Sequence, residues 1–380
     1  MAQRVVIVGS GSGGTMVANR LVRAVTEDVR TGKVEIVLIG AESTHVYQPG
    51  FLYIALGQAQ PDGFKRPETE MLLPGVQWIP EAAAKIDADK KSVQLASGRT
   101  VEYDFLVLAT GSVPDLDAIP GFREGGYSFY TMDEALRLRD ALQSFDHGKL
   151  LLIIGVPHKC PVAPLEFLFM YDDWLRRTGK REQIELEYTY PIARLHSLQP
   201  VSDWIEKAFP ERNIESQTFF NAESVDPAKK IVYTLEGEEV NYDLLVGIPP
   251  HVGAQVIRDS KLGDRDGWIP TDRLTLKVKG YDKMYAIGDC TDLPLSKAGS
   301  TTHYESEVVV KNLVHELRGE KPVVLYDGKI YCFIEAGLDQ ATHISFDYNH
   351  PPEPSNPTAT VHWFKLAFNE MYWLSLRGLF

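Results

Sequence analysis

The chain contains little cysteine. Its 380 residues include three cysteines, at positions 160, 290 and 332. They are too few and too far apart for a disulfide-stapled scaffold or for a zinc site built on CxxC pairs, and we expect no metal. Any bond between two of them is therefore expected to be catalytic rather than structural.

Positive charge and long apolar runs are also lacking. The formal net charge is -13, which excludes nucleic acid as a partner because its phosphates require lysine and arginine patches. No run of about 18 uncharged apolar residues is present, so we expect no membrane-spanning helix. Residues 1–4 lead directly into an apolar stretch without the pattern of a secretory leader, which favours a cytoplasmic location. What remains, 44% apolar and 24% charged residues, is typical of a globular protein of two or three domains.

A glycine-rich turn follows the first apolar run. Residues 5–8 (Val-Val-Ile-Val) precede Gly9-x-Gly11-x-x-Gly14, a spacing that predicts a strand, a tight turn and a helix. Gly9 permits the turn, Gly11 lets the backbone approach a pyrophosphate, and Gly14 lets the helix pack on the strand. The alternative is an ordinary glycine turn without a ligand. We favour dinucleotide binding.

A second copy of this turn has lost two glycines. Residues 151–154 (Leu-Leu-Ile-Ile) precede Gly155, but Pro157 stands where Gly11 stands in the first copy, and Cys160 stands for Gly14. A proline ring and a thiol-bearing Cβ both obstruct a diphosphate. The strand expected at 184–190 also lacks an acidic residue at its end for a ribose. We therefore expect no NAD(P)H at this site.

An internal repeat indicates the domain layout. Residues 87–104 and 226–243 share eight identical positions at a constant offset of 139 residues. Each copy alternates apolar and polar residues about a glycine turn, which predicts a hairpin, and a buried strand should follow. Two related nucleotide-binding domains follow from this, the second inserted in the first. The strand expected at 283–287 should rejoin the first domain.

Family motifs extend over nearly the whole chain. The chain resembles the two-dinucleotide-domain flavoprotein superfamily in three motifs: Gly9-x-Gly11-x-x-Gly14, Ala109-Thr110-Gly111 and Gly288-Asp289. Within that superfamily, the chain resembles the sulfide:quinone oxidoreductases and the flavoprotein subunit of flavocytochrome c sulfide dehydrogenases. Three segments carry this resemblance: residues 159–166 (Lys-Cys-Pro-Val-Ala-Pro-Leu-Glu), 248–251 (Ile-Pro-Pro-His) and 297–299 (Lys-Ala-Gly).

The resemblance implies an α/β fold with two Rossmann-like dinucleotide-binding domains, the second inserted in the first, plus a C-terminal helical membrane-association segment. The expected FAD-binding domain comprises residues 1–115 and 266–330. Residues 116–265 form the second Rossmann-like domain, with its degenerate nucleotide fingerprint. Residues 331–380 form the C-terminal segment, which carries the second catalytic cysteine and an amphipathic helix.

The cofactor that the resemblance implies is FAD. Its attachment should be non-covalent, because residues 42–52 contain no cysteine. Glu42, beyond the strand expected at 34–39, is a candidate ligand of the adenine ribose or else a solvated loop residue. Lys297 resembles a lysine near the isoalloxazine, with a surface lysine as the alternative. The expected FAD ligands are Gly9, Gly11, Gly14, Glu42, Thr110, Gly111, Gly288, Asp289, Lys297 and Gly299.

The expected catalytic residues are Cys160, Cys332 and Glu166. Cys160 should lie at the start of a helix spanning 163–176, a position that lowers a thiol pKa. Cys332 resembles the partner cysteine of the family. Glu166 is either an acid/base for sulfide protons or a carboxylate that complements the helix dipole. Many relatives carry a third cysteine where this chain has Ser128, so a two-cysteine cycle is expected.

The C-terminal tail is rich in aromatic residues. Lys365, Glu370 and Arg377 argue against full burial in hydrocarbon, so we expect residues 361–380 to form a helix lying in a membrane interface. The alternative is a helix packed on its own domain or on a subunit partner, and a homo-oligomer stays open. The expected location is peripheral, on the cytoplasmic side of the cell membrane. The predicted apolar side consists of Trp363, Phe364, Ala367, Phe368, Met371 and Leu374.

These observations favour a sulfide:quinone oxidoreductase, in which a Cys160/Cys332 redox pair and FAD convert sulfide to zero-valent sulfur or polysulfide and reduce membrane quinone. Three alternatives stay open. A sulfide dehydrogenase flavoprotein would pass electrons to a cytochrome c on another subunit, because this chain has no CxxCH. A non-catalytic flavin-binding scaffold would show no turnover. An NADH:quinone reductase would take its electrons from NADH.

Overall fold

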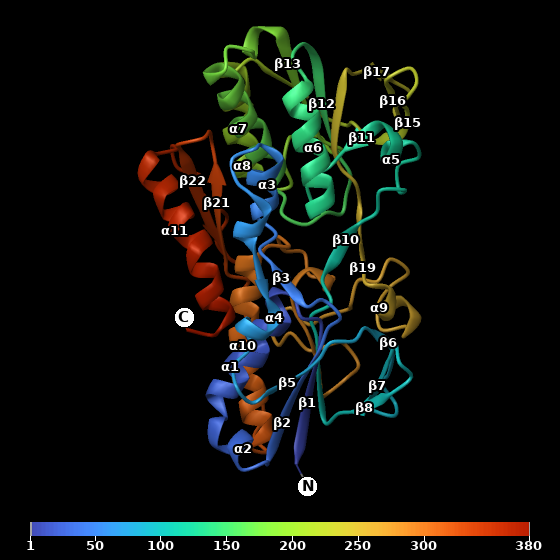
Figure 1. Ribbon diagram of the computed structural model, residues 1–380, viewed down its shortest axis with the longest axis vertical. Coiled ribbons are helices and arrows are strands. Elements are labelled where there is room, and N and C mark those ends of the chain that lie inside the picture. The colour runs from blue at the N-terminus through green and yellow to red at the C-terminus, as the bar shows by residue number, and fades with distance from the viewer. Residues whose placement is uncertain (1, 380) are drawn as a thin grey trace.

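Two five-stranded parallel sheets dominate the computed structural model, which describes residues 2–379 (Figure 1). The first sheet has the order β20-β9-β1-β2-β5. Its central strands are apolar on both faces, as expected for a parallel sheet covered on two sides. Its strands are β1 (Gln3–Val8), β2 (Val34–Ile39), β5 (Val76–Ile79), β9 (Phe105–Leu108) and β20 (Met284–Ala286).

The second sheet repeats the first and lies between β9 and β20 in the chain. Its order is β11-β18-β12-β13-β14, and β20 then returns to pair with β9. Both the α/β class and the insertion of one Rossmann-like unit in the other are therefore confirmed, whereas the domain boundaries at 115, 265 and 330 stay a prediction. The strands are β11 (Gly126–Tyr127), β12 (Gly148–Ile154), β13 (Ile184–Thr189), β14 (Ile214–Gln217) and β18 (Leu244–Ile248).

The sequence repeat forms two matching antiparallel sheets of three strands, one strand more than the predicted hairpin. Val93 pairs with Val101 in one copy, as Val232 pairs with Val240 in the other. A repeated aspartate explains part of the sequence identity: Asp104 accepts a hydrogen bond from the N–H of Arg4 in β1, and Asp243 accepts one from the N–H of Lys149 in β12. The strands are β6 (Ala83–Asp87), β7 (Ser92–Leu95), β8 (Thr100–Glu102), β15 (Ala222–Asp226), β16 (Ile231–Thr234) and β17 (Glu239–Asn241).

Helices cover one face of each sheet, and the small antiparallel sheets cover the other. Helices α1 and α10 pack on the first sheet, while α6, α7 and α8 pack on the second. The main helices are α1 (Ser12–Ala24), α6 (Met132–Ser144), α7 (Ala163–Arg177), α8 (Gln199–Glu211), α10 (Gly299–Leu317) and α11 (Ala359–Leu376). Shorter helices are α2 (Thr26–Arg30), α3 (Gly50–Ala55), α4 (Glu68–Met71), α5 (Phe122–Gly125) and α9 (Gln255–Asp259), with 3-10 turns η1 (Pro61–Phe64), η2 (Arg181–Gln183) and η3 (Gly288–Cys290).

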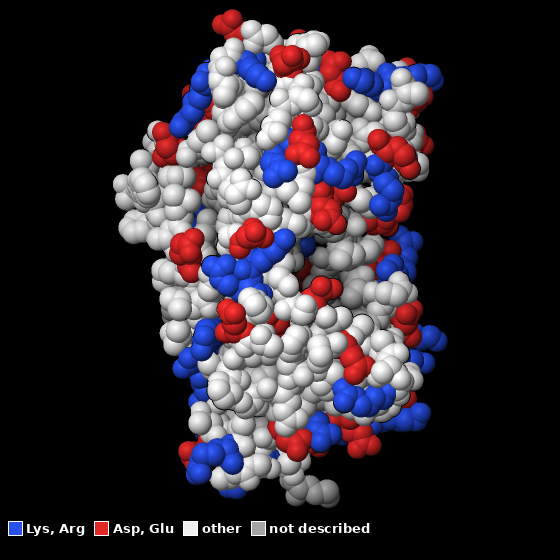
Figure 2. Space-filling view, viewed as in Figure 1, with Lys and Arg blue, Asp and Glu red and all other residues white. Residues whose placement is uncertain are grey.

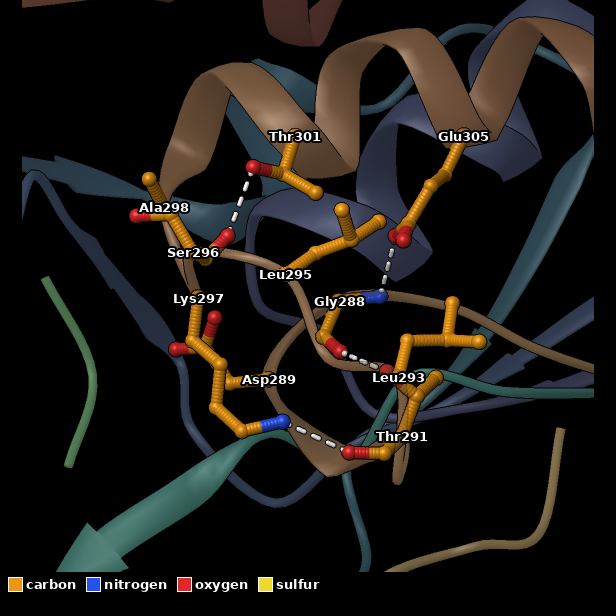
Figure 3. Close-up of a pocket in the computed structure, with 10 residues that line it drawn as sticks. All are labelled: Gly288, Asp289, Thr291, Leu293, Leu295, Ser296, Lys297, Ala298, Thr301 and Glu305. Carbon is orange, nitrogen blue, oxygen red and sulfur yellow. Dashed lines mark hydrogen bonds between the residues drawn. The ribbon is translucent and has the colours of Figure 1, made fainter. Parts of the chain in front are cut away.

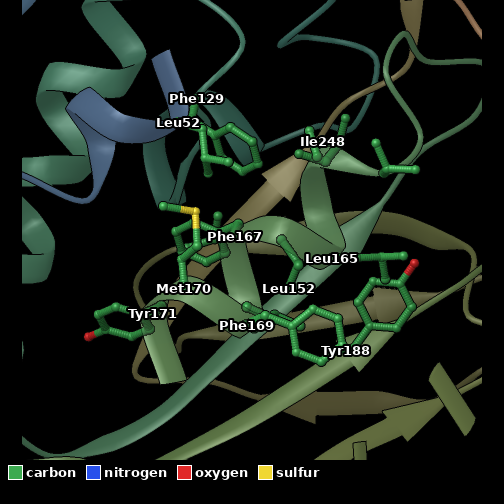
Figure 4. Close-up of a cluster of buried hydrophobic side chains, with 14 of the residues drawn as sticks. Leu52, Phe129, Leu152, Leu165, Phe167, Phe169, Met170, Tyr171, Tyr188 and Ile248 are labelled. Atoms are coloured by element: carbon green, nitrogen blue, oxygen red, sulfur yellow. The ribbon is translucent and has the colours of Figure 1, made fainter. Parts of the chain in front are cut away.

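Two features join the sheets. Strand β10 (Ser112–Pro114) pairs with β19 (His251–Gly253) in the middle of the molecule (Figure 1). Helix α3, although it lies early in the chain, packs into the core of the second sheet, where Leu52 meets Phe129 and Phe167 (Figure 4). A further pair, β3 (Thr44–Val46) with β4 (Lys65–Pro67), precedes α4.

The C-terminal segment adds the hairpin of β21 (Ile330–Glu335) and β22 (Ala341–Phe346), followed by α11. Helix α11 turns polar side chains inward: Lys365, Asn369 and Tyr372 are buried. The six apolar residues predicted to form one side of the tail helix are all exposed. The edge of the molecule formed by α11 accordingly shows few charged side chains (Figure 2). Within residues 2–379 no helix combines the length and the apolar character needed to cross a membrane.

Candidate functional site

The first glycine turn forms a cradle between β1 and α1. Gly9 has φ 109°, and a Cβ on it would lie 2.3 Å from the carbonyl oxygen of Ala109. A Cβ on Gly14 would lie 1.8 Å from the carbonyl oxygen of Gly9. Gly11 differs, because a Cβ there would meet nothing within 4 Å. The first turn of α1 contains no acidic residue, so its free N–H groups present an open, positively polarised surface that fits a diphosphate.

The neighbouring strand ends complete this side of the cradle. Gly111 follows β9 with φ 66°, and a Cβ there would also face open space. Thr110, just before it, is half-buried. Glu42 lies exposed, three residues beyond the end of β2, and is thus accessible to a ligand, but no contact of the described residues holds its carboxylate in place.

A small cavity lies beside this cradle, where the chain leaves β20 and enters α10 (Figure 3). Gly288, with φ 74°, and Asp289 form one wall, and Lys297 lies at the same end of the cavity as Asp289. The Lys297 ammonium donates to the carbonyl of Thr291 at 2.6 Å and lies 4.5 Å from the centre of the Trp268 ring. Burial lowers the pKa of Lys297. It is therefore a partly buried, held cation rather than a solvated one.

Cys160 lies three residues before α7, the helix predicted at 163–176. Its N–H donates to the carbonyl of Lys297 at 2.8 Å, and its carbonyl accepts from the Tyr130 hydroxyl at 3.0 Å. Its φ is 49°. This left-handed conformation costs a residue with a side chain roughly 1–2 kcal/mol, so the two hydrogen bonds hold the cysteine in a strained position.

Cys332 approaches the same segment from the other side. It lies in β21, opposite Ile344, and its sulfur is 3.9 Å from the hydroxyl of Ser300. Ser300 lies three residues after Lys297, which holds Cys160. Residues 297–300, here called the linking segment, therefore contact both cysteines. The two thiols are free, and each side chain packs on the same hydrophobic core.

Both thiols are poor acids in this structure. Burial raises the pKa of Cys332 to about 11. Burial raises the pKa of Cys160 further, and the carboxylate of Glu166 adds to the effect. The expectation that a helix N-terminus lowers the pKa of Cys160 is therefore wrong. Cys160 stands before the first turn of α7, and loss of solvent outweighs the helix dipole.

Glu166 forms a buried ion pair in the first turn of α7. One of its carboxylate oxygens accepts from the Lys365 ammonium of α11 and, at 2.9 Å, from the N–H of Glu335. Burial raises the pKa of Glu166, while attraction to its carboxylate holds the pKa of Lys365 well above the usual value. Lys365 is one of the charged residues that argued against burying the tail in hydrocarbon. The ion pair takes it into the interior of the protein instead.

Further buried polar groups, from α11 and from the segments that pack against it, lie next to this ion pair. The carboxylate of Glu335, at the end of β21, accepts from the Tyr53 hydroxyl at 2.8 Å and pairs with His362 at 2.9 Å. The amide of Asn369 accepts from the Tyr47 hydroxyl at 2.6 Å. Sequence reasoning missed these residues, because they come from α3, the turn before it, β21 and α11 and share no local motif.

Two other residues near the cofactor cradle were also missed. Lys159 is buried, and its ammonium donates to the side chain of Gln48 at 2.8 Å. Glu305, in α10, lines the cavity beside Gly288 and is 1% exposed. Lys159 could have been found from the motif at 159–166, which it opens just before Cys160. No sequence pattern indicated Glu305.

The second glycine turn is filled by the chain itself. A Cβ on Gly155 would lie 2.5 Å from the ring of Pro250, and the carbonyl of Pro157 accepts from the N–H of His251 at 2.6 Å. Residues 248–251 thus pack directly over this second turn, the counterpart of the open glycine turn between β1 and α1.

Comparisons with known proteins agree with this geometry. A family model described as pyridine nucleotide-disulphide oxidoreductase matches residues 3–309. The mitochondrial sulfide:quinone oxidoreductase of Mus musculus is 26% identical, over 98% of this chain and 86% of the mouse protein. The sulfide-quinone reductase of Aquifex aeolicus is 25% identical, over 100% of this chain and 92% of its own. These similarities confirm the resemblance predicted from the motifs.

The fold is matched by a solved structure. The X-ray structure of the sulfide:quinone oxidoreductase from Aquifex aeolicus superposes with a TM-score of 0.87 and 24% sequence identity, covering 99% of this chain and 92% of that one. The shared architecture includes the segment that carries Cys332.

The two glycines of the cradle provide a matched pair of variants. Gly14→Ala should lower the free energy of unfolding of the apoprotein by about 3 kcal/mol or more, because its methyl group overlaps a backbone oxygen. Gly11→Ala should leave the apoprotein stable to within about 0.5 kcal/mol and weaken FAD binding. Denaturant unfolding and FAD titration measure the two effects. Equal destabilisation by both variants would contradict the assigned geometry.

The buried ion pair makes a second prediction. Lys365→Met should destabilise the protein by about 3–5 kcal/mol, because it leaves the Glu166 carboxyl without its partner. Adding Glu166→Gln should recover most of that loss, since the carboxylate that Lys365 neutralises is then gone. Lys90→Met, which removes an exposed lysine paired with Asp87, is the control and should leave the unfolding midpoint unchanged. A double variant no more stable than Lys365→Met would argue against the pair.

Proposed function

The chain belongs to the pyridine nucleotide-disulphide oxidoreductase family, and on that basis we propose that it is an FAD-dependent sulfide:quinone oxidoreductase. Sulfide is oxidised to zero-valent sulfur or polysulfide, and the electrons reach quinone in a membrane. The relatives named above supply the substrate class, and the arrangement of the two cysteines supplies the chemistry.

One observation carries this proposal: Cys160 and Cys332, far apart in the sequence, both contact the linking segment at 297–300. Lys297 accepts the N–H of Cys160, and Ser300 contacts the sulfur of Cys332. The same segment borders the cavity formed by Gly288 and Asp289. Two thiols beside a cofactor cradle form the arrangement that a dithiol relay requires.

FAD is the proposed electron acceptor of the thiols, bound without a covalent link. The N–H groups at the start of α1 and the open side of Gly11 suit its diphosphate, Glu42 its adenine ribose, and Asp289 its ribityl chain. Gly111 and Gly299 leave room for it, Thr110 lies next to Gly111, and Lys297 offers a positive charge. When bound, FAD accepts two electrons and returns them to quinone. Packing of Pro250 over Gly155 supports the proposal that NAD(P)H is not the reductant.

The sulfur chemistry belongs to the cysteines. Hydrosulfide attacks a Cys160–Cys332 disulfide: one new S–S bond forms, the old one breaks, and the products are a persulfide on one cysteine and a thiolate on the other. Because burial favours protonated thiols in the reduced site, proton movement accompanies each turn of the cycle. Glu166, paired with Lys365 beside both sulfurs, is the proposed group that holds those protons.

The exposed side of α11 supports membrane binding. Trp363 is 68% exposed and Phe364 63% exposed, whereas His362, Lys365 and Asn369 of the same helix are buried against the protein. A surface helix of a globular protein normally has its apolar side toward the core and its polar side toward water. We therefore propose that α11 lies in a lipid interface with this side down, as a peripheral contact on the cytoplasmic side of the cell membrane.

The function is tested by following the absorbance of the oxidised flavin anaerobically. Sulfide should bleach it, and a soluble quinone should restore it. Cys160→Ser and Cys332→Ser should each slow bleaching by at least about 100-fold. Cys290→Ala is the matched control, since Cys290 is buried and donates to the carbonyl of Ile287 at 3.2 Å, and it should bleach at the normal rate.

Each competing function has its own outcome in that experiment. Restoration by a cytochrome c but not by quinone would indicate a sulfide dehydrogenase flavoprotein. A flavin that sulfide never bleaches would indicate a binding scaffold, and bleaching by NADH instead would indicate an NADH:quinone reductase. Normal rates in both serine variants would refute the two-cysteine cycle.

Membrane binding is tested by sedimentation with uncharged phosphatidylcholine vesicles. Replacing Trp363, Phe364 and Phe368 together by serine should reduce binding by at least about 100-fold, because each buried aromatic side chain contributes roughly 1.5–3 kcal/mol. Leu235→Ser, at another exposed apolar position, should have no effect. Added salt should not release the wild type, since the contact is apolar. Release by salt would instead indicate a purely electrostatic attachment.

A further inference from the structure

Glu305 is a buried carboxyl group that has no role in the proposed sulfur chemistry. It lies in the second turn of α10 and is 1% exposed. One oxygen accepts a hydrogen bond of 2.6 Å from the N–H of Gly288. Among the described residues, its other oxygen has no hydrogen-bond partner. A buried carboxylate without a cation in contact is unfavourable, so the neutral acid is the form that this environment stabilises.

The side chain of Glu305 also borders a cavity. Glu305 lines the cavity shared with Gly288, Asp289 and Lys297 (Figure 3). Its free volume, about 10 Å³, is close to the least that a single water molecule needs. Because Glu305 is 1% exposed and the cavity is this small, bulk solvent does little to stabilise its ionised form.

The cavity adjoins the cofactor cradle. A methyl group on Gly13, in the first turn of α1, would come within 2.9 Å of Thr302. Thr302 lies one turn before Glu305 on α10. Helix α10 thus packs against the start of α1, where the diphosphate is expected, and Glu305 supports the turn that carries Asp289.

Some charged groups around Glu305 raise the pKa of its carboxyl group, and others lower it. Burial raises its pKa to about 8; the hydrogen bond from the Gly288 N–H and the charge of Lys297 oppose this rise, and Asp289 adds to it. Tyr326 and Tyr348 also face it, and their own pKa values are raised in part by its charge. FAD brings further negative charge, which raises the pKa of a nearby carboxyl group.

We propose that Glu305 is the proton-holding residue of the FAD site: it fixes the Gly288–Asp289 turn and stays protonated while the cofactor is bound, so that cofactor binding in mildly alkaline solution takes up a proton. The proposal rests on FAD being the cofactor. Glu305 acts through the turn and is therefore a positioning residue. A purely structural hydrogen bond would predict no proton uptake.

The test is calorimetric titration of the full-length apoprotein with FAD in buffers of different ionisation enthalpy, which counts the protons bound. For the wild type, uptake should be near zero at pH 6 and about half a proton near pH 8.5, if FAD raises the pKa by about one unit. The FAD dissociation constant should correspondingly rise up to about tenfold between pH 7 and pH 10.

Three variants assign the proton. Glu305→Gln keeps an acceptor for the Gly288 N–H and should abolish both the uptake and this rise. Glu307→Gln, on the same helix but paired with Arg20 at the surface, should behave as wild type. Lys297→Met should keep the uptake and move it to higher pH, because the opposing cation is gone.

The outcomes separate this inference from the proposed function. No FAD binding by the wild type would refute the cofactor assignment itself. FAD binding without uptake at pH 8.5, or uptake that Lys297→Met abolishes, would overturn the role of Glu305. If Glu305→Gln fails to fold, the wild-type pH profile and Lys297→Met still decide the question.

Discussion

The buried pair of Lys365 and Glu166 determines how the C-terminal helix sits on the protein. A lysine and a glutamate are stable in an interior only when they meet with good geometry. Because Lys365 belongs to α11 and Glu166 to α7, their contact dictates which side of α11 faces inward. Asn369 and Tyr372 follow on the same side and are buried too. The aromatic residues of α11 are consequently left on the outside, and the charge pair is left beside the two thiols.

A second constraint brings the sulfur chemistry to the cofactor cradle. The linking segment leads from the first sheet into α10, and on its way it accepts the backbone of Cys160 and contacts the sulfur of Cys332. The second sheet, the first sheet and the C-terminal hairpin therefore meet at four consecutive residues. Neither cysteine is placed by its own element alone, since Cys160 precedes its helix and Cys332 lies within a two-stranded hairpin.

Local patterns predicted much of this arrangement, because their causes are local. The glycine spacing at 9–14 reports steric contacts within one turn, and the helix expected at 163–176 extends from Ala163 to Arg177. The repeat at a constant offset indicated the inserted domain. The burial of Lys365 and the position of α3 depend on partners hundreds of residues away or in another sheet, so composition and periodicity contain no trace of them. The thiol pKa was misjudged for the same reason: helix position is local, whereas burial is a property of the whole fold.

The left-handed backbone of Cys160 has a consequence for how this site evolves. Glycine adopts φ 49° without steric cost, so Cys160→Gly would remove the thiol and at the same time release strain that offsets the lost packing. Such an allele would still yield a well-folded, abundant protein. Chaperones and proteases, which eliminate many harmful substitutions by recognising unfolded chains, would not detect it. Only natural selection on the chemistry itself preserves this codon, and a lineage that no longer needs sulfide oxidation would drift readily toward an inactive flavin carrier.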